Sequence, residues 1–564
     1  MFRRRRWGIH EIAPDEIFLD SSNLPAHESS QFEGRLQRPV ARKSILGVGV
    51  VFALVALVFG GRAFDLQIVR GASFAQVSHN NTLQSWPIFA NRGLIYDRTG
   101  VRLAWSEAQN TVVNATSTYA LRRYITDPGF SVLLGFVRYP KQDASGAWWR
   151  NTYSGVEGVE RAFDHLLLGN NGSTMIETDA HGRLVQQNIS TPAEHGQDLH
   201  LTVDADLQTQ LFRTLSAHAS KQRFVGGASV IMDVRTGEIL AMTSFPEYDN
   251  QAFTDGDALA IRKASQSAAT PMLDRAVSGL YAPGSIVKPI FAAAALNEKL
   301  ISPEKQILST GAISIPNPYD PERPSIFRDW TVHGWVDMRT ALAVSSDEYF
   351  YTIGGGYGDQ RGLGIEKINE YAARFGLGIK TGIALSGEKE GNVPSIDWKA
   401  RVFPDDPWRI GNTYHTAIGQ YGFQVTPIQA VRFVAAIANG GALLTPQLIA
   451  SSTPRSTQLD IPDDYLQIVR EGMRLAVTSN RNDATVKSLY IGGIQIAAKT
   501  GTAQIGTHNQ WMNSWSVGYW PADNPRYAYA TVLEHAPAGT ASGASPAMTP
   551  FFQWLVEAHP EYVE

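Results

Sequence analysis

The segment YAPGSIVKPIFAAAALNEKL, residues 281–300, contains a serine and a lysine three positions apart, Ser285 and Lys288. Pro283 and Gly284 interrupt the chain just before the serine, and helix-forming residues follow, so the pattern predicts a helix that begins at Ser285. Residues three apart share a helix face, which predicts that the Lys288 amine lies beside the Ser285 hydroxyl. This pairing is typical of a nucleophile with its base.

A lysine accepts a proton at neutral pH only if its pKa lies far below the usual value of about 10.4. Burial and the positive end of a helix dipole both disfavour the ammonium form, so we expect a lowered pKa at Lys288. The same four-residue pattern recurs at Ser302–Lys305 and Ser386–Lys389, both in polar segments with acidic neighbours. Those lysines are expected to stay charged and solvated, so the first copy is the predicted nucleophile.

Two later motifs supply the other groups that acyl transfer needs. SSD at residues 345–347 provides a second serine and a carboxylate, and KTGT at residues 499–502 follows the apolar run IGGIQIAA, which predicts a buried strand. A strand edge with lysine, threonine and backbone N–H groups suits a substrate carboxylate and its carbonyl oxygen. A second KTG, at residues 380–382, lies in a glycine-interrupted connection and is predicted to be structural.

Together YAPGSIVKP, SSDEYFY and KTGTAQ resemble the active-site motifs of class B penicillin-binding proteins, the peptidoglycan transpeptidases. The likeness extends to NRGLIYDRTGVRLA, SGVEGVERAFDHLLLG, DLHLTVDADLQ and GASVIMDVRTGEILAMTSFPEYDNQAF, and so covers most of the chain from about Arg92 to about Glu534. Asp347, where many relatives have Asn, and the RDW…HGW stretch are similar to members of the elongation type. Tyr421, in GQYGFQVTP, stands where a glycine is common in the family.

The resemblance implies a role for each matched residue. Ser285 would be the acylated nucleophile, Lys288 its general base, and Ser345 a proton relay to the leaving group. Asp347 would orient a lysine, although its charge raises the pKa of a neighbouring lysine. Lys499 would complete the catalytic group, and the residues that bind the substrate's terminal carboxylate would be Lys499, Thr500, Gly501 and Thr502. The backbone N–H groups of Ser285 and Thr502 would form the oxyanion hole. No cofactor is implied.

Asp329 and His333, in FRDWTVHGW, raise the question of a metal, because relatives of the elongation type can carry a structural zinc nearby. A structural zinc takes four ligands, most often with thiolate among them. The chain has no cysteine. We therefore predict a hydrogen-bonded loop at this place and no metal.

The apolar run SILGVGVVFALVALVFGG, Ser44–Gly61, is uncharged and spans roughly 27 Å as a helix. A cleaved signal peptide is the alternative, but the preceding arm is long and no A-x-A site follows before Arg62. Basic residues near a span stay in the cytoplasm. The arm carries Arg3–Arg6, Arg35, Arg38, Arg42 and Lys43, which predicts a single-pass protein of the cytoplasmic membrane with its N-terminus inside and its catalytic part outside.

The chain has 564 residues, more than one hydrophobic core accommodates, and its net charge of -4 gives no reason to expect nucleic-acid binding. Strand pairs are predicted around the turn at residues 234–237 and between SWSVGYW and RYAYATVLEH. The expected fold class is α+β, an antiparallel sheet flanked by helices, preceded by an elongated, mostly β pedestal and one transmembrane helix. The predicted domains are a basic arm (1–43), a transmembrane helix (44–64), the pedestal (65–201), a linker helix (202–226) and a transpeptidase domain (227–556).

By resemblance, the chain is a penicillin-sensitive D,D-transpeptidase that crosslinks peptidoglycan stem peptides on lipid-linked glycan strands during elongation. The implied partners are beta-lactams, the membrane and a polytopic SEDS-type glycan polymerase. A hydrolase, either a carboxypeptidase or a beta-lactamase, is one alternative, but it needs a base that activates water, and no motif is assigned to that task. A scaffold or beta-lactam sensor without turnover is another, which the complete set of motifs disfavours.

Overall fold

The structure is a computed structural model that describes residues 41–81, 83–108, 119–144, 147–178, 184–317, 320, 322–450 and 453–564. The predicted basic arm lies outside the described residues up to position 40. By internal packing the chain divides into two units, one formed by residues 1–84 and 177–186 and the other by residues 85–176 and 187–564.

The first unit contains a long apolar helix. Helix α1 (Arg42–Phe64) continues through a π-helical turn (Asp65–Val69), and this 28-residue stretch is long and apolar enough to cross a membrane. No residue of α1 is buried within the chain, so its apolar surface is left for another environment. Helix α2 (Gly71–Asn81) follows.

Where the structure describes them, residues 83–200 form short strands and helical turns. Strands β11, β2, β3 and β4 form a four-stranded sheet, and β1, β9 and β10 form a three-stranded one. The elements are β1 (Leu83–Ile88), β2 (Ile95–Tyr96), β3 (Arg102–Glu107), β4 (Leu121–Tyr124), α3 (Ser131–Leu134), β5 (Val137–Arg138), β6 (Lys141–Gln142), β7 (Trp148–Arg150), β8 (Ser154–Gly155), α4 (Gly158–Ala162), α5 (Asp164–Leu167), β9 (Gly172–Thr178), β10 (Leu184–Thr191) and β11 (Leu199–His200).

A buried ion cluster holds this region together and accounts for the NRG sequence at its start. The Nε atoms of Arg92 and Arg122 lie 2.5 and 2.7 Å from the two carboxylate oxygens of Glu160, and all three side chains are fully buried. A Cβ atom at Gly93 would collide with the backbone carbonyl of Gln197. Removal of Glu160 would leave the buried guanidinium of Arg122 without its carboxylate, which is strongly destabilising.

A five-stranded antiparallel sheet forms the centre of the C-terminal part, in the order β13-β12-β22-β21-β20. Both predicted strand pairs are confirmed, β12 (Gly226–Asp233) with β13 (Ile239–Phe245) and β21 (Trp511–Trp520) with β22 (Tyr527–Pro537). The predicted strand in IGGIQIAA is wrong in extent, because β20 runs from Ala497 to Ile505 and contains the KTG motif itself. Gly493, with φ +86°, lies in a turn where the strand was expected to begin.

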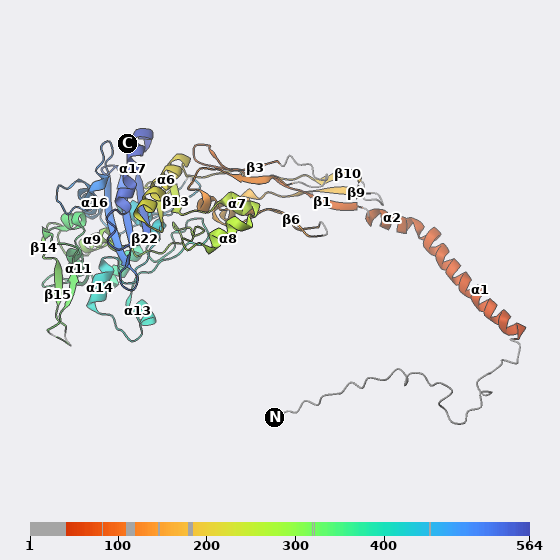
Figure 1. Ribbon diagram of the computed structural model, residues 1–564, viewed down its shortest axis with the longest axis horizontal. Coiled ribbons are helices and arrows are strands. Elements are labelled where there is room, and N and C mark those ends of the chain that lie inside the picture. The colour runs from red at the N-terminus through yellow and green to blue at the C-terminus, as the bar shows by residue number, and fades with distance from the viewer. Residues whose placement is uncertain are drawn as a thin grey trace, which may run out of the picture. The chain divides into compact units, whose positions relative to one another are not determined.

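Alternating side chains of the sheet build two cores. Ile231 packs with residues of helices α6 (Ala205–Gln222) and α17 (Ala544–Ala558), whereas Val230 and Met232 pack with residues of α15 (Pro427–Ala438). Successive residues of a strand point to opposite faces, so α6 and α17 cover one face and α15 the other. Figure 1 shows α6 and α17 close to strands β13 and β22. The predicted α+β class is confirmed.

The other elements of this part surround the sheet. They are α7 (Asn250–Asp255), α8 (Ala258–Gln266), η5 (Gly284–Val287), α9 (Lys288–Asn297), β14 (Ile307–Ser309), β15 (Ala312–Ile315), β16 (Ser325–Arg328), β17 (Gly334–Val336), α10 (Met338–Val344), α11 (Asp347–Gly355), α12 (Gly364–Arg374), α13 (Ile396–Val402), α14 (Ile410–Ala417), β18 (Ala442–Leu444), β19 (Ser456–Gln458), α16 (Asp463–Thr478), η6 (Lys487–Leu489) and η7 (Pro560–Tyr562).

Candidate active site

Ser285 lies in the 3-10 turn η5, and α9 begins three residues later, at Lys288. The turn packs directly on strand β20. A Cβ atom at Gly284 would lie 2.7 Å from the backbone oxygen of Thr502, and one at Gly501 would lie 2.6 Å from that of Pro283, so glycine is required on both sides of this contact. Ser285 is half-buried and lines a cleft of about 870 Å³.

Lys288 is fully buried, and its amine makes three hydrogen bonds. It donates to the backbone oxygen of Ser345 at 2.8 Å, to the hydroxyl of Ser345 at 3.4 Å and to Asp347 Oδ1 at 2.6 Å. Among the described residues it makes no hydrogen bond with Ser285. The predicted base, Lys288, is therefore hydrogen-bonded to the SSD motif, while Ser285 lines the cleft.

The SSD motif forms the corner between helices α10 and α11. Ser345 ends α10 with φ +58°, a left-handed conformation that non-glycine residues rarely adopt, and Ser346 caps α11 by accepting the Tyr349 N–H. Asp347 is consequently the first residue of α11. Strained backbone of this kind is concentrated at functional sites.

Lys499 reaches the same corner from strand β20. Its buried amine donates to the Ser345 hydroxyl at 2.7 Å and to the backbone oxygen of Thr500 at 2.8 Å. Burial, and next the charge of Lys288, hold the pKa of Lys499 well below its usual range, while Asp347 opposes this shift. Burial raises the pKa of Asp347, and the nearby lysines oppose that rise. The two amines thus share the hydroxyl of Ser345, and Lys288 also pairs with the carboxylate of Asp347.

Thr500 and Thr502 line the cleft together with Ser285, Ser345 and Asp347. They lie on β20, which pairs with β21 on one side only and is therefore an edge strand of the sheet. The cleft thus brings together residues from three separate stretches of the chain. Every residue that the sequence singled out for catalysis or carboxylate binding lies in or directly beneath it.

The other motif copies lie elsewhere. Ser302 bonds to Glu304 and Lys305 to Gln360, both as exposed interactions. Lys380 is exposed, and the neighbouring Thr381 bonds to Glu388 within a loop. None of these residues lines the cleft.

Asp329 and His333 belong to an ion-pair network behind the SSD corner. Asp329 accepts the Ser346 hydroxyl at 2.8 Å and the Glu348 N–H at 2.9 Å, and it lies 3.5 Å from His333 Nε2. His333 Nδ1 lies 2.8 Å from Asp483, which also pairs with Arg481. The donors do not fit a structural zinc. One imidazole and two carboxylates already occupied by hydrogen bonds fall short of four ligands. The described residues contain no group of three or more histidine, cysteine, aspartate or glutamate residues that could hold a metal ion.

Some cleft residues were not predicted from the sequence. Arg328, Trp330 and Tyr351 line it, and so does His415 of α14, whose pKa burial lowers. His415 lies four residues before Gly419 in the stretch that ends in GQYG, but a single histidine carries no pattern of its own. Tyr421, which replaces the common glycine, has φ +65°, the conformation that glycine adopts without strain.

The arrangement defines a class of protein. The sequence model of the penicillin-binding protein transpeptidase domain matches residues 227–555, and that of the penicillin-binding protein dimerisation domain matches residues 113–201. The chain belongs to the penicillin-binding protein transpeptidase family.

Particular members of the family are similar over almost the whole length. The peptidoglycan D,D-transpeptidase MrdA of Haemophilus influenzae is 26% identical over 93% of this chain and 93% of its own. The crystal structure of Pseudomonas aeruginosa PBP2 in complex with WCK 5153 superposes with a TM-score of 0.68 at 28% identity, covering 85% of this chain and 100% of that one. A chain from a structure titled as a peptidoglycan synthase complex that coordinates polymerization and crosslinking shares the fold, with a TM-score of 0.70 at 24% identity over 92% of this chain and 98% of that one. The predicted likeness to elongation-type class B proteins, penicillin-binding protein 2 in particular, is confirmed.

Proposed function

We propose that this chain is a peptidoglycan D,D-transpeptidase that crosslinks stem peptides through an acyl-enzyme at Ser285. The observation that carries the proposal is the convergence of Ser285, Lys288, Ser345, Asp347 and Lys499 on one cleft. A nucleophile beside a buried proton relay is what acyl transfer through serine requires.

In the first half-reaction, the Ser285 hydroxyl attacks the carbonyl of the penultimate D-Ala of a stem peptide. The hydroxyl proton passes to the amine of Lys288, the proposed base, and through Ser345 to the departing amine of the terminal D-Ala. The backbone N–H groups of Ser285 and Thr502 stabilise the oxyanion. An amine of a neighbouring stem peptide then attacks the ester and regenerates the serine.

The substrate's terminal carboxylate is assigned to Lys499, Thr500, Gly501 and Thr502. Support comes from β20 being an edge strand whose threonines line the cleft, with the amine of Lys499 fully buried beside them. A carboxylate at this strand stands next to the Ser345 hydroxyl, so carboxylate binding and proton transfer involve neighbouring groups.

The cellular setting is proposed from α1 and from the relatives. Helix α1 would anchor the chain in the cytoplasmic membrane, and Arg42 and Lys43 at its start, with the basic arm before them, would keep the N-terminus inside. The proposed domains are a basic arm (1–43), a transmembrane helix (44–64), a pedestal (65–201), a linker helix (202–226) and a transpeptidase domain (227–556). A polytopic glycan polymerase is the proposed partner during elongation, supported by the fold shared with a chain of a peptidoglycan synthase complex.

Labelling with a fluorescent penicillin tests the proposal. The full chain in detergent is compared with Ser285→Ala and with Ser302→Ala, the matched control in another S-x-x-K copy, by gel and intact mass over time. We expect lasting label on wild type and on Ser302→Ala, and none on Ser285→Ala. Label on Ser285→Ala would refute the assignment of the nucleophile. Rapid loss of label with consumption of penicillin would indicate a beta-lactamase instead.

A further inference from the structure

Lys399 is a buried lysine that lies outside the active-site cleft. Its side chain, on helix α13, is 1% exposed, and it does not line the cleft. The amine donates to the backbone oxygen of Pro407 and to Asn412 Oδ1, each at 2.8 Å, and it pairs with Asp406 Oδ2 at 2.8 Å. An ammonium has three donors, so all of them have a partner. Lys399 thus holds the connection between α13 and α14 in place.

The same amine lies against an aromatic group. It is 5.6 Å from the centroid of the Tyr421 ring, within the range of a cation–π interaction. The rings of Trp398 and Trp408 each lie 5.9 Å from that ring, at interplanar angles of 78° and 89°. We call Lys399, Trp398 and Trp408 the tyrosine box, because all three side chains contact the ring of Tyr421.

The backbone of Tyr421 requires support of this kind. Its φ of +65° is left-handed, which costs a non-glycine residue on the order of 1–2 kcal/mol. Such a conformation persists only where the surrounding structure fixes it. The next residue, Gly422, packs so closely on Trp398 that a Cβ atom there would collide with the indole ring. The tyrosine box therefore holds both the ring and the backbone of this stretch.

The stretch around Tyr421 is joined at both ends to the residues just before the nucleophile. The backbone oxygen of Gly419 accepts the N–H of Gly284 at 3.0 Å. Tyr281 and Val425 exchange two backbone hydrogen bonds, at 3.0 and 2.9 Å. Tyr421 lies between these two attachments, so a change in its backbone conformation is passed to the segment that leads into η5.

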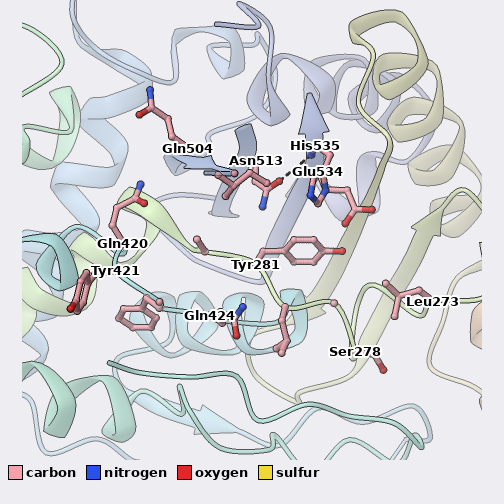
Figure 2. Close-up of a pocket in the computed structure, with 17 residues that line it drawn as sticks. Leu273, Ser278, Tyr281, Gln420, Tyr421, Gln424, Gln504, Asn513, Glu534 and His535 are labelled. Atoms are coloured by element: carbon pink, nitrogen blue, oxygen red, sulfur yellow. Dashed lines mark hydrogen bonds between the residues drawn. The ribbon is translucent and has the colours of Figure 1, made fainter. Parts of the chain in front are cut away.

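Tyr421 also borders the cleft. It lines the cleft together with Gln420 and Ser285. Figure 2 shows the side chains of Gln420 and Tyr421 next to each other, where a second pocket of about 550 Å³ adjoins the cleft. A shift of this backbone would move the wall of the cleft and the turn that carries the nucleophile. A displacement of about 1 Å at a reacting group can slow a reaction on the order of 100-fold.

We propose that Lys399 is a positioning residue for acylation, which acts through the ring of Tyr421 to fix residues 419–422 and so the turn that carries Ser285. The inference rests on the proposed function, because acylation of Ser285 is the step that it concerns. Lys399 does not touch the substrate. Its loss should therefore slow formation of the covalent bond without a comparable loss of ligand binding.

Stopped-flow acylation by a fluorescent penicillin tests the proposal, with the rate constant at saturation measured separately from the concentration of half-saturation. Lys399→Met removes the charge and all three donors, whereas Lys399→Gln keeps one amide group for hydrogen bonding. Arg432→Met is the matched control. It removes a buried cation of α15 that donates to the backbone oxygen of Leu444 at 2.7 Å and does not line the cleft. All variants are full chains in detergent, and thermal unfolding shows that they are folded.

We expect the saturating rate constant to fall about tenfold or more in Lys399→Met and less in Lys399→Gln, with half-saturation within about threefold of wild type. Arg432→Met should stay within about twofold of wild type in both quantities.

A double-mutant cycle identifies the route through Tyr421. Glycine adopts the left-handed conformation without support, so Tyr421→Gly removes the need for the tyrosine box. In the Tyr421→Gly background, Lys399→Met should therefore slow the saturating rate constant by only about twofold or less.

An equal loss from Lys399→Met in both backgrounds would overturn the proposal, and so would an equal loss in Arg432→Met. A change confined to half-saturation would also overturn it, because Lys399 would then act on binding. If neither lysine variant folds, Lys399 serves stability alone and the proposal fails. Absence of penicillin label on wild type would instead reject the proposed function.

Discussion

Ser345 combines strain and chemistry in a single residue. Its backbone holds φ +58° at the corner between α10 and α11, while its hydroxyl accepts the amine of Lys499 at 2.7 Å. A left-handed conformation costs a non-glycine residue on the order of 1–2 kcal/mol. The corner tolerates this cost because Ser345 places its hydroxyl between two lysines.

Replacement of Ser345 should therefore separate stability from activity. Both Ser345→Gly and Ser345→Ala lose the hydroxyl and should slow acylation by penicillin on the order of 100-fold. Ser345→Gly should nevertheless be about 1 kcal/mol more stable than Ser345→Ala, because glycine adopts the left-handed region without strain. Thermal unfolding and stopped-flow acylation measure the two effects. Equal stability of the variants would show that the corner is not strained.

At the scale of single residues, the sequence predicts which side chains form the candidate active site but not which of them are hydrogen-bonded to one another. Spacing along one helix places Lys288 near Ser285, yet the structure gives its three hydrogen bonds to Ser345 and Asp347. Those partners lie more than 50 positions away, and only the packing of α10 and α11 against α9 brings them close. Local periodicity carries no information about such contacts.

At the scale of helices and strands, the contact between η5 and the segment around Gly419 requires glycine. Gly419 has φ +76°, and a Cβ there would collide with the backbone of Gly284, whereas Gly256 has φ +77° with nothing within 4 Å. Both Gly419→Ala and Gly256→Ala pay the conformational cost of about 1 kcal/mol. Only Gly419→Ala must also displace η5.

We therefore expect Gly419→Ala to lose about 3 kcal/mol of stability or more and to slow penicillin acylation at least about tenfold. Gly256→Ala should keep the wild-type acylation rate. Denaturant unfolding and acylation kinetics of the two variants provide the comparison. Similar losses in both would mean that backbone conformation, and not contact with η5, decides the effect.

The network behind the SSD corner predicts a pH dependence. Burial lowers the pKa of His333, but its hydrogen bonds to Asp329 and Asp483 raise it above the usual value. Burial raises the pKa of Asp329, yet His333 and the N–H of Glu348 bring it down to about 2, and Arg481 with His333 lowers that of Asp483 to about 2. Because the pKa of His333 is higher in the folded protein than in the unfolded chain, its charged form stabilises the fold below about pH 6.5. This stabilisation is lost as the pH rises through the pKa of the folded state. The lowered pKa values of the two carboxylates stabilise the folded state above about pH 4, and this stabilisation is lost as the pH falls toward 2.

His333→Gln should remove the alkaline decline in stability. The stability difference between wild type and His333→Gln should be roughly 1–3 kcal/mol near pH 5.5, the range for charged hydrogen bonds, and should shrink at alkaline pH. Thermal unfolding of both full chains from pH 5 to pH 9 measures it. A difference that stays constant across this range would show that His333 is not charged in the folded protein.

Elements of the sheet were predictable where alternation and turn residues agree, as in β12 with β13 and β21 with β22. The start of β20 was not, because Gly492 and Gly493 interrupt an apolar run that otherwise has the composition of a strand. The sequence predicts that a regular helix begins at Ser285, whereas the structure has a short 3-10 turn there. The second difference arises from a tertiary contact, the packing of η5 on β20.

At the scale of the whole molecule, the apolar helix and the catalytic part have separate tasks. Helix α1 buries none of its residues within the chain, whereas the cleft is built entirely from residues after position 284. Removal of residues 1–64 should therefore move the protein from the membrane fraction to the soluble fraction. Its penicillin acylation rate should remain within about twofold of wild type. Fractionation and labelling kinetics check both, and a large loss of acylation would show that the helix supports the cleft.

The two buried lysines also tie ligand binding to solution acidity. Burial and the charge of Lys288 hold the pKa of Lys499 well below its usual range, and the nearby carboxylate of Asp347 offsets this only in part. A bound carboxylate beside Lys499 supplies the missing negative charge and favours its protonation. Anionic ligands would then arrive with uptake of a proton, and the enthalpy of binding would depend on the buffer that gives the proton up. Binding of an anionic ligand to the cleft would thus be coupled to binding of a proton.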